Sequence, residues 1–358
     1  MGEGLPLSAM TGCAGLPVEG GWTGRKVVGV MVVAQVTGPG EWLADEVRGR
    51  DEWKVWLTEE HRREVLAAVR AAGPSPAEVS EEGFRLPALG PVLREVRAEL
   101  VGGRGFVLVR GVPVEEMSEH ECAVAALGLG CHVGGVVAQG ETLLKHVRDT
   151  GADPARARSF EHSGRLGYHS DPSDVVALLC VRPAMSGGAS AIVGSVAVHN
   201  EVARTRPDLA EVLYQPWWHD RRTGDGPDSF YAQPICVARD GGGLSMAYGP
   251  DYLRSAQRGA EVPPFSAAQR EVMELLDRLT NDARFALTME LRTGDMQFLN
   301  NHVVLHSRTA YADHPDPARR RHLLRLWLAT GRGEVQPSAR SARSSSAAST
   351  RSLSPVVR

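Results

Sequence analysis

The sequence has few cysteines, no long apolar run and little net charge, and each absence excludes a class of protein. Only five cysteines occur among 358 residues, scattered and without a C-x-x-C pair, which indicates neither a zinc ribbon nor a disulfide framework. The longest apolar run near the start, residues 27–36, is interrupted by Gly29 and Gln35 and is too short to span a bilayer. A formal net charge of −3 provides no field that would attract nucleic acid or an anionic membrane.

The remaining composition, 42% hydrophobic and 23% charged, is typical of a globular protein. Scattered cysteines fit a reducing compartment, and the start of the chain lacks the pattern of a signal peptide. We therefore expect a cytoplasmic protein that binds neither nucleic acid nor membrane. An arginine-rich tail is the one feature that would suggest nucleic acid, and a solvated tail explains it more simply.

Composition also divides the chain. Residues 1–40 are expected to form a weakly ordered leader, with the true start left open between Met1 and Met31. Residues 41–333 are expected to form one domain. Residues 334–358 are expected to form a disordered Ser/Arg-rich tail, because residues 338–351 contain only serine, alanine, arginine and threonine and cannot bury a core.

Hydrophobic periodicity predicts both helices and strands. Helices are expected over residues 41–72, 91–100, 117–129, 198–203, 208–213 and 266–280, with Thr58, Ser118 and Ser266 as N-caps. Strands are expected over residues 106–111, 143–147, 174–181, 189–195 and 320–330, and residues 214–233 are expected to form a long loop that could cover an active site. This mixture predicts an α+β fold, a double-stranded β-helix (jelly roll) core with flanking α-helices.

A His-x-Asp pair, His169 and Asp171, is the first candidate for chemistry. In a strand, residues two apart point to the same face, so this imidazole and carboxylate would meet at one point. Two ligands make a poor site, but two histidines and one carboxylate on one face of an iron are the arrangement used by non-heme Fe(II) oxygenases. Taken alone, such a pair often occurs by chance, and a surface turn that ends at Pro172 explains it more simply.

Three later features, in order along the chain, favour a metal site. A glycine turn leads into the hydroxyl of Ser190, and a third candidate ligand, His306, follows in the sequence Leu-His-Ser-Arg. Arg321 and Arg325 then lie four apart on a predicted strand and share a face. Two cations in a β core are costly unless anions meet them, and a guanidinium is well shaped to bind a carboxylate. Ion pairs with acids on the sheet surface would explain this spacing equally well.

This ordered set resembles the TauD/TfdA (taurine dioxygenase) family of Fe(II)/2-oxoglutarate-dependent oxygenases, which includes clavaminate synthase-like members. The resemblance covers about residues 100–330. It implies that His169, Asp171 and His306 bind Fe(II). Ser190, where the family usually has threonine, and Arg321 would bind 2-oxoglutarate, and Arg325 would face an acidic group of the prime substrate. His302 and Arg320 remain alternatives to His306 and Arg321.

The resemblance further implies a dioxygenase that uses O2 and 2-oxoglutarate to oxidise an unactivated carbon of a small, carboxylate-bearing metabolite. Succinate and CO2 would be released, and hydroxylation is the expected outcome. Desaturation, cyclisation, epoxidation or a non-catalytic jelly-roll binding protein remain alternatives. Halogenation is disfavoured, because halogenases of this superfamily replace the acidic ligand by a small residue and Asp171 is present here. The substrate and any homo-oligomer stay open.

Overall fold

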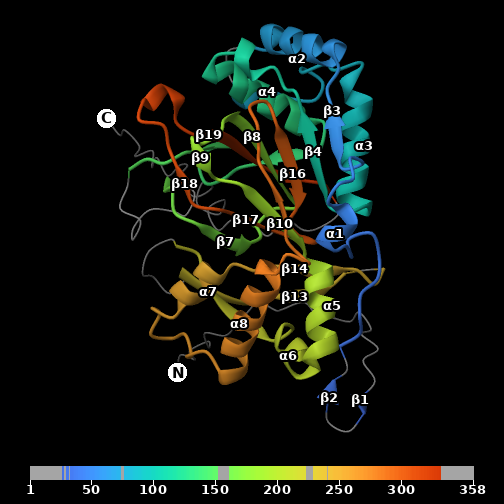
Figure 1. Cartoon of the computed structure of the whole chain (residues 1–358), viewed down its shortest axis with the longest axis vertical. Coiled ribbons are helices and arrows are strands. Elements are labelled where there is room, and N and C mark those ends of the chain that lie inside the picture. The colour runs from blue at the N-terminus through green and yellow to red at the C-terminus, as the bar shows by residue number, and fades with distance from the viewer. Residues whose placement is uncertain are drawn as a thin grey trace, which may run out of the picture.

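Two facing β-sheets carry the candidate site. The computed structural model describes residues 26–27, 30–31, 33–73, 76–151, 161–222, 229–239 and 241–331, arranged as in Figure 1. The larger sheet contains β3 (Lys54–Trp56), β4 (Phe106–Arg110), β5 (Gly135–Val137), β6 (Leu144–Val147), β8 (Val175–Arg182), β16 (Met296–Asn300) and β19 (His322–Ala329). The smaller sheet contains β7 (Leu166–His169), β10 (Ser190–Gly194), β15 (Leu287–Met289) and β17 (Val304–Arg308).

The strand order confirms the predicted jelly roll. The larger sheet runs β3-β4-β16-β8-β19-β5, with β6 also paired to β19, and the smaller runs β15-β10-β17-β7. Strands that are remote in sequence therefore lie side by side, and all pairs are antiparallel except β3 with β4. The buried strands predicted over residues 106–111 and 174–181 are confirmed as β4 and β8.

The inner faces of the two sheets form one core. Phe106 and Leu299 from the larger sheet pack in the same buried cluster as Ile192 and Leu287 from the smaller one. Along β19 the side chains alternate, because successive residues of a strand point to opposite faces. Leu324, Leu326 and Leu328 pack outward under the helices, whereas Leu323 joins the core between the sheets.

Helices cover the outer face of each sheet (Figure 1). The larger sheet is covered by α2 (Glu59–Ala71), α3 (Leu89–Gly102) and α4 (Glu119–Cys131). The smaller sheet is covered by α5 (Ser195–Thr205), α6 (Pro207–Val212) and α8 (Ala267–Asn281), with α7 (Pro250–Ala256) nearby. The predicted N-caps Thr58, Ser118 and Ser266 each accept a hydrogen bond from the first turn of the helix that follows.

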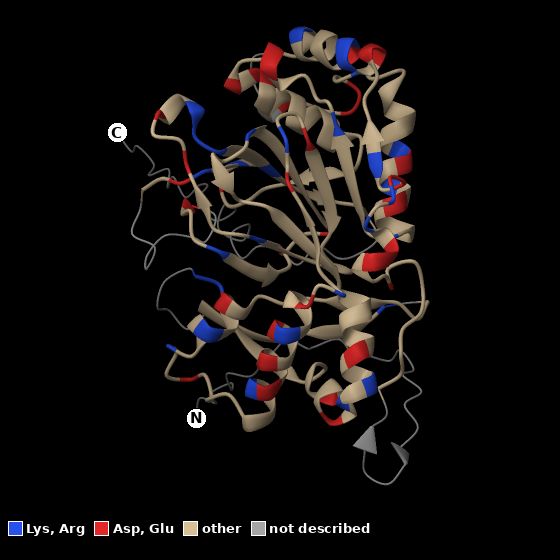
Figure 2. Ribbon diagram, in the orientation of Figure 1, with Lys and Arg blue, Asp and Glu red and all other residues tan. Residues whose placement is uncertain are grey.

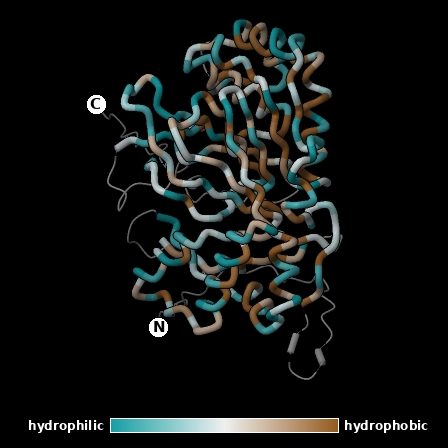
Figure 3. The backbone as a smooth tube through the Cα atoms, viewed as in Figure 1, coloured by the Kyte–Doolittle hydropathy of each residue, from teal (hydrophilic) through white to brown (hydrophobic). Residues whose placement is uncertain are grey.

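Shorter elements complete the described chain. They are α1 (Ala44–Val47), the turns η1 (Pro76–Glu78), η2 (Val114–Glu116) and η5 (Pro317–Arg319), and the paired strands β1 (Lys26–Val27) with β2 (Val30–Met31), β9 (Ser186–Gly187) with β18 (Tyr311–Ala312), β11 (Pro216–Asp220) with β12 (Phe230–Pro234), and β13 (Cys236–Ala238) with β14 (Leu244–Met246). Figures 2 and 3 show the resulting pattern: charged residues gather on the covering helices, and apolar residues concentrate along the central strands.

Two predictions of secondary structure are wrong. Within residues 41–72, the segment Lys54–Trp56 is strand β3, because it extends the larger sheet by pairing in parallel with β4. Within residues 214–233, the hairpin of β11 and β12 replaces the expected loop. Trp217 on β11 is fully buried in the apolar cluster between the smaller sheet and its covering helices. Residues 223–228 of the expected lid lie outside the described residues.

The ends of the domain are only partly described. Residues 33–40, assigned to the leader by composition, pack on α5: Val33 is buried, and Asn200 exchanges hydrogen bonds of 2.9 and 2.7 Å with the backbone of Val36. Most of the leader and the predicted tail over residues 334–358 lie outside the described residues.

Candidate active site

Three predicted ligands come together between the sheets. His169 ends β7 and is the register partner of His306 on β17, and their ring centroids lie 4.2 Å apart. One ligand atom from each of His169, Asp171 and His306 lies within 4.8 Å of the others. The expected strand geometry is wrong for Asp171, because β7 ends at His169 and Asp171 reaches the cluster from the turn that follows.

Hydrogen bonding and burial prepare the two imidazoles to bind a metal. His169 Nδ1 donates to the carbonyl oxygen of Gly167 at 2.9 Å, which leaves Nε2 with the lone pair that a metal requires. Burial, reinforced by neighbouring His169, lowers the pKa of His306 to about 3. His306 is therefore neutral at physiological pH, the form in which histidine binds metals.

Asp171 supplies a buried, ionised carboxylate. Its side chain is 8% exposed, and its Oδ1 lies 3.5 Å from Nη1 of Arg325. Burial raises the pKa of Asp171, but the nearby Arg325 guanidinium and then His306 act in the opposite direction. The net pKa of Asp171 is below its usual value. The cluster thus offers two imidazoles and one carboxylate, a donor set that fits Fe(II).

Asn301 holds the turn that carries Asp171. Its Oδ1 accepts from the backbone N–H of Asp171 at 3.0 Å, and its Nδ2 donates to Ser173 O at 3.0 Å and Ser173 Oγ at 3.2 Å. Asn301 also donates its own backbone N–H to Asp174 O. The sequence analysis quoted Asn301 without a role, because a hydrogen bond spanning 130 residues leaves no local pattern.

Gln139 holds Arg325 beside Asp171 and was not predicted. The side chain of Gln139 is 4% exposed, accepts from Arg325 Nε at 2.9 Å and donates to the Arg325 carbonyl oxygen at 2.9 Å. Arg325 itself lies on β19 and lines the cavity, as predicted from its strand position. No local signal marks Gln139, because it lies in a short loop far from β19 in sequence.

The opposite end of the cavity carries a hydroxyl and more positive charge. Ser190 begins β10, and its Oγ donates to Gln297 Oε1 at 3.0 Å. Arg321 is 5% exposed, and its Nη1 lacks a hydrogen-bond partner among the described residues. Gly188 has φ +73°, and a Cβ there would lie 3.3 Å from Arg321 Nε, so a side chain would crowd the guanidinium.

Arg308 joins Arg321 at this end, and the sequence analysis assigned it no role. It lies on β17 two residues after His306 and directly opposite Ser190 in the ladder. Burial and then Arg321 lower the pKa of Arg308 to about 10, which still leaves the side chain protonated at neutral pH. Its position in the Leu-His-Ser-Arg sequence, on the same strand face as His306, was a signal that could have identified it.

These groups line one cavity between the sheets. The polar lining is provided by His169, Ser190, His306, Ser307, Arg308, Arg321 and Arg325, and the apolar lining by Val147, Leu166, Leu178, Leu291 and Leu323. The geometry therefore places a cluster of possible metal ligands beside a small apolar space with cations at both ends.

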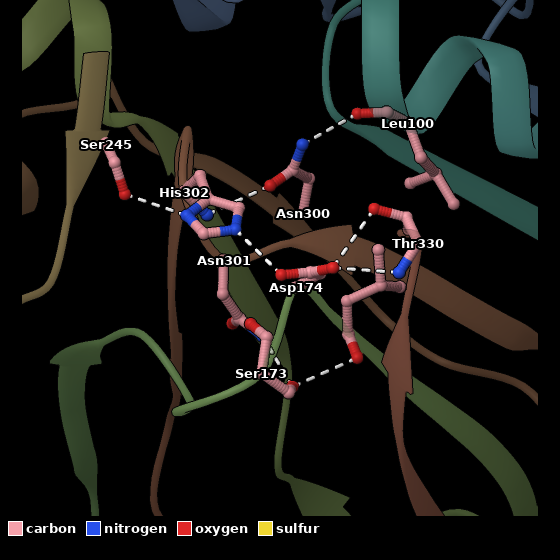
Figure 4. A network of polar contacts seen from close by, with 9 residues as sticks. Leu100, Ser173, Asp174, Ser245, Asn300, Asn301, His302 and Thr330 are labelled. Carbon is pink, nitrogen blue, oxygen red and sulfur yellow. Dashed lines mark hydrogen bonds and ion pairs between the residues drawn. The ribbon is translucent and has the colours of Figure 1, made fainter. Parts of the chain in front are cut away.

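The two alternative residues lie elsewhere. His302 is part of a separate network, with Nδ1 2.7 Å from Ser245 Oγ and Nε2 3.1 Å from Asp174 Oδ1 (Figure 4). Arg320 is exposed, and its Nε donates to His314 O at 3.4 Å. Neither side chain lines the cavity, which favours His306 and Arg321.

A second group of potential ligands, Glu119, His146 and His322, forms a hydrogen-bonded chain. His146 Nδ1 lies 2.8 Å from His322 Nε2, and Glu119 Oε1 lies 3.0 Å from His322 Nδ1. The two nitrogens of His322 point to different partners, Nε2 to His146 and Nδ1 to Glu119. Only one nitrogen of an imidazole can bind a given ion, so His322 connects its two neighbours by hydrogen bonds. Arg148 and Arg182 approach Glu119 and His322 at 3.4 and 3.5 Å, and their charge opposes a cation. We assign these three hydrogen-bonded side chains a structural role.

The jelly roll and its cluster of two histidines and one carboxylate define the class of non-heme iron oxygenases. The family model described as "Taurine catabolism dioxygenase TauD, TfdA family" matches residues 69–327. The chain belongs to this family. It is an Fe(II)- and 2-oxoglutarate-dependent dioxygenase that oxidises a small molecule, and the non-catalytic alternative is not favoured. Among the described residues, none of the helices is both long and apolar enough to cross a membrane.

Named relatives agree with the family assignment, and solved structures agree with the fold. The chain is 29% identical to the taurine hydroxylase-like protein SAT17 of Stachybotrys chartarum, over 80% of this chain and 77% of that protein. It is 28% identical to FR-33289 synthase of Streptomyces rubellomurinus, over 84% and 92%. The fold is similar to that of asparagine oxygenase with Fe(II), 3-hydroxyasparagine and succinate, with a TM-score of 0.62, 18% identity and coverage of 78% and 94%. It is also similar to that of the non-heme iron oxygenase OrfP with Fe, succinate and (3S)-hydroxy-L-Arg, with a TM-score of 0.58, 13% identity and coverage of 77% and 94%.

Proposed function

We propose that His169, Asp171 and His306 bind the Fe(II) of this dioxygenase. The observation that supports the proposal most directly is the convergence of one ligand atom from each residue within 4.8 Å. The Asn301 hydrogen bond to Asp171 and the Gly167 hydrogen bond to His169 orient two of the three ligands before any ion binds.

Arg321 and Ser190 are proposed to bind the distal carboxylate of 2-oxoglutarate. Both line the cavity that contains His169 and His306, and Arg321 retains a buried N–H without a partner among the described residues. A guanidinium binds a carboxylate through two parallel hydrogen bonds. The Ser190 hydroxyl, which donates its one hydrogen to Gln297 in this structure, can add a third by rotating toward the carboxylate. When bound, the iron and 2-oxoglutarate supply the oxidation of an unactivated carbon by O2, with release of succinate and CO2.

The prime substrate is proposed to be a small anionic metabolite that is hydroxylated. Arg325 lines the cavity and is held beside Asp171 by Gln139, so its charge lies next to the proposed metal ligands. The apolar wall, which includes Leu178 and Leu323, would exclude water from the carbon that reacts. A uridine-5'-phosphate dioxygenase of Amycolatopsis sp is 32% identical over 42% of this chain, which supports a phosphate as well as a carboxylate as the anion.

The proposal is tested by anaerobic titration of the apo-protein with Fe(II) and 2-oxoglutarate, followed by visible absorption. Chelation of 2-oxoglutarate to Fe(II) gives a weak metal-to-ligand charge-transfer band. We expect this band in the wild type and in His302→Ala, and its loss in His169→Ala and in Asp171→Ala. A band that survives in both ligand variants, or is absent from the wild type, would show that the proposed site is wrong.

A further inference from the structure

Arg308 is placed to act on the same ligand as Arg321. It ends β17, two residues beyond His306, and therefore points to the same face of the strand. In the ladder between β10 and β17 its register partner is Ser190, so the guanidinium and the hydroxyl extend from adjacent positions on one face. Arg308 is 6% exposed and lines the cavity together with Ser190 and Arg321.

The hydrogen bonds of Arg308 leave part of its guanidinium unused. Nη2 donates to the carbonyl oxygens of His162 and Gly164. Nε and Nη1 are buried and have no hydrogen-bond partner among the described residues. Within the described ranges, no carboxylate lies within ion-pair distance of the Arg308 side chain either. A purely structural arginine would have these donors satisfied, because buried unpaired donors are costly.

A second buried cation adjoins the first. The guanidinium carbons of Arg308 and Arg321 lie 4.8 and 4.9 Å from the centroid of the Tyr311 ring. Contact with an aromatic ring stabilises each cation but does not remove the repulsion between them. Two buried guanidiniums with unused donors are stabilised when an anion lies between them.

We propose that Arg308 is a second guanidinium for the distal carboxylate of 2-oxoglutarate, which it binds jointly with Arg321 and Ser190. This inference rests on the proposed function, because it assumes that 2-oxoglutarate occupies this cavity. With Arg308 as well as Arg321, the cavity has two cations at its distal end. It therefore selects more strongly for a 2-oxo acid with a second carboxylate than Arg321 alone would.

The test compares two ligands that differ only at the distal end. 2-Oxopentanoate keeps the 2-oxo acid group that chelates iron and replaces the distal carboxylate by a methyl group. The dissociation constants of both are measured anaerobically on the Fe(II)-loaded protein, from the charge-transfer band, for the wild type, Arg308→Gln, Arg308→Lys and Arg320→Gln. Fe(II) binding without either ligand is measured in parallel.

In Arg308→Gln we expect 2-oxoglutarate to bind about 10- to 100-fold more weakly, the effect of losing charge-assisted hydrogen bonds. The affinities for 2-oxopentanoate and for Fe(II) should stay unchanged. Arg308→Lys, which keeps the charge but loses the planar fork, should show a smaller loss for 2-oxoglutarate alone. Arg320→Gln, an exposed neighbour, should behave as the wild type.

Other outcomes separate the possible failures. Equal weakening of both ligands in the Arg308 variants would mean that Arg308 shapes the cavity without binding the distal carboxylate, and unchanged binding of 2-oxoglutarate would also overturn the inference. A wild type that shows no charge-transfer band with 2-oxoglutarate would instead refute the proposed function. If Arg308→Gln does not fold, Arg308→Lys alone decides, because its loss must be confined to 2-oxoglutarate.

Discussion

Replacing Asn301 by alanine should separate the positioning of the proposed iron ligands from the stability of the fold. Asn301 is 4% exposed, and it connects the turn between β16 and β17 to the turn that carries Asp171. Alanine removes the acceptor for the Asp171 N–H and the donor to Ser173 O, and leaves both backbone groups buried without these partners.

The expected magnitude follows from these two lost hydrogen bonds. Each buried group left without a partner costs about 1–3 kcal/mol, so the free energy of unfolding should fall by about 2–5 kcal/mol. The turn would then hold Asp171 less firmly. Loss of an outer-shell hydrogen bond typically weakens metal binding about 10- to 100-fold, and we expect that loss of Fe(II) affinity.

The neighbouring Asn300 provides a matched control (Figure 4). It is 7% exposed, donates to Leu100 O at 2.8 Å and accepts from the backbone N–H of His302 at 2.9 Å. Its side chain therefore makes bonds of the same kind without touching the turn of Asp171. Asn300→Ala should lose comparable stability in denaturant unfolding but keep the wild-type affinity for Fe(II).

Anaerobic titration with Fe(II), under conditions where every variant is folded, measures the difference. Wild-type affinity in Asn301→Ala would refute the reasoning and leave Asn301 as a structural residue only. Equal losses of affinity in Asn300→Ala and Asn301→Ala would refute it as well, because destabilisation of the turn between β16 and β17 would then explain both.

Three further predictions test the site and the fold. Arg321→Gln should weaken 2-oxoglutarate binding by about 10-fold or more whereas Arg320→Gln should not, and the opposite result would reassign the carboxylate contact. Burial lowers the pKa of His219 from 6.5 to about 4, so the contribution of His219 to stability is complete above pH 6.5 and is lost as the pH falls toward 4. In unfolding experiments, His219→Phe should reduce the stability lost between pH 6.5 and 4 by about 3 kcal/mol, and an unchanged pH profile would contradict this. Trp217→Ala should lower the free energy of unfolding by about 3–5 kcal/mol, because the side chain is fully buried under the β11–β12 hairpin, whereas a loss typical of a surface residue would show that the hairpin packs differently.

The sequence by itself determined the fold class and the identities of most candidate residues. Apolar strands such as β4 and β8 and capped helices such as α4 and α8 follow from local patterns. The Thr58, Ser118 and Ser266 caps could be predicted because a cap depends on residues within one turn of it. Where a neighbour remote in sequence overrides the local pattern, as at Lys54–Trp56 beside β4, the prediction was wrong.

Only the tertiary structure decided how the candidate residues meet. The register of β7 against β17 sets His169 opposite His306. His306 lies on β17 and lines the cavity, whereas His302 lies in the turn before β17 and bonds to Asp174. Gln139 and Asn301 act through hydrogen bonds to residues 186 and 130 positions away in the sequence. Arg308 is identified by its buried Nε and Nη1, which have no hydrogen-bond partner among the described residues. Such contacts depend on strand pairing across the whole chain, and a local sequence window contains no information about that pairing.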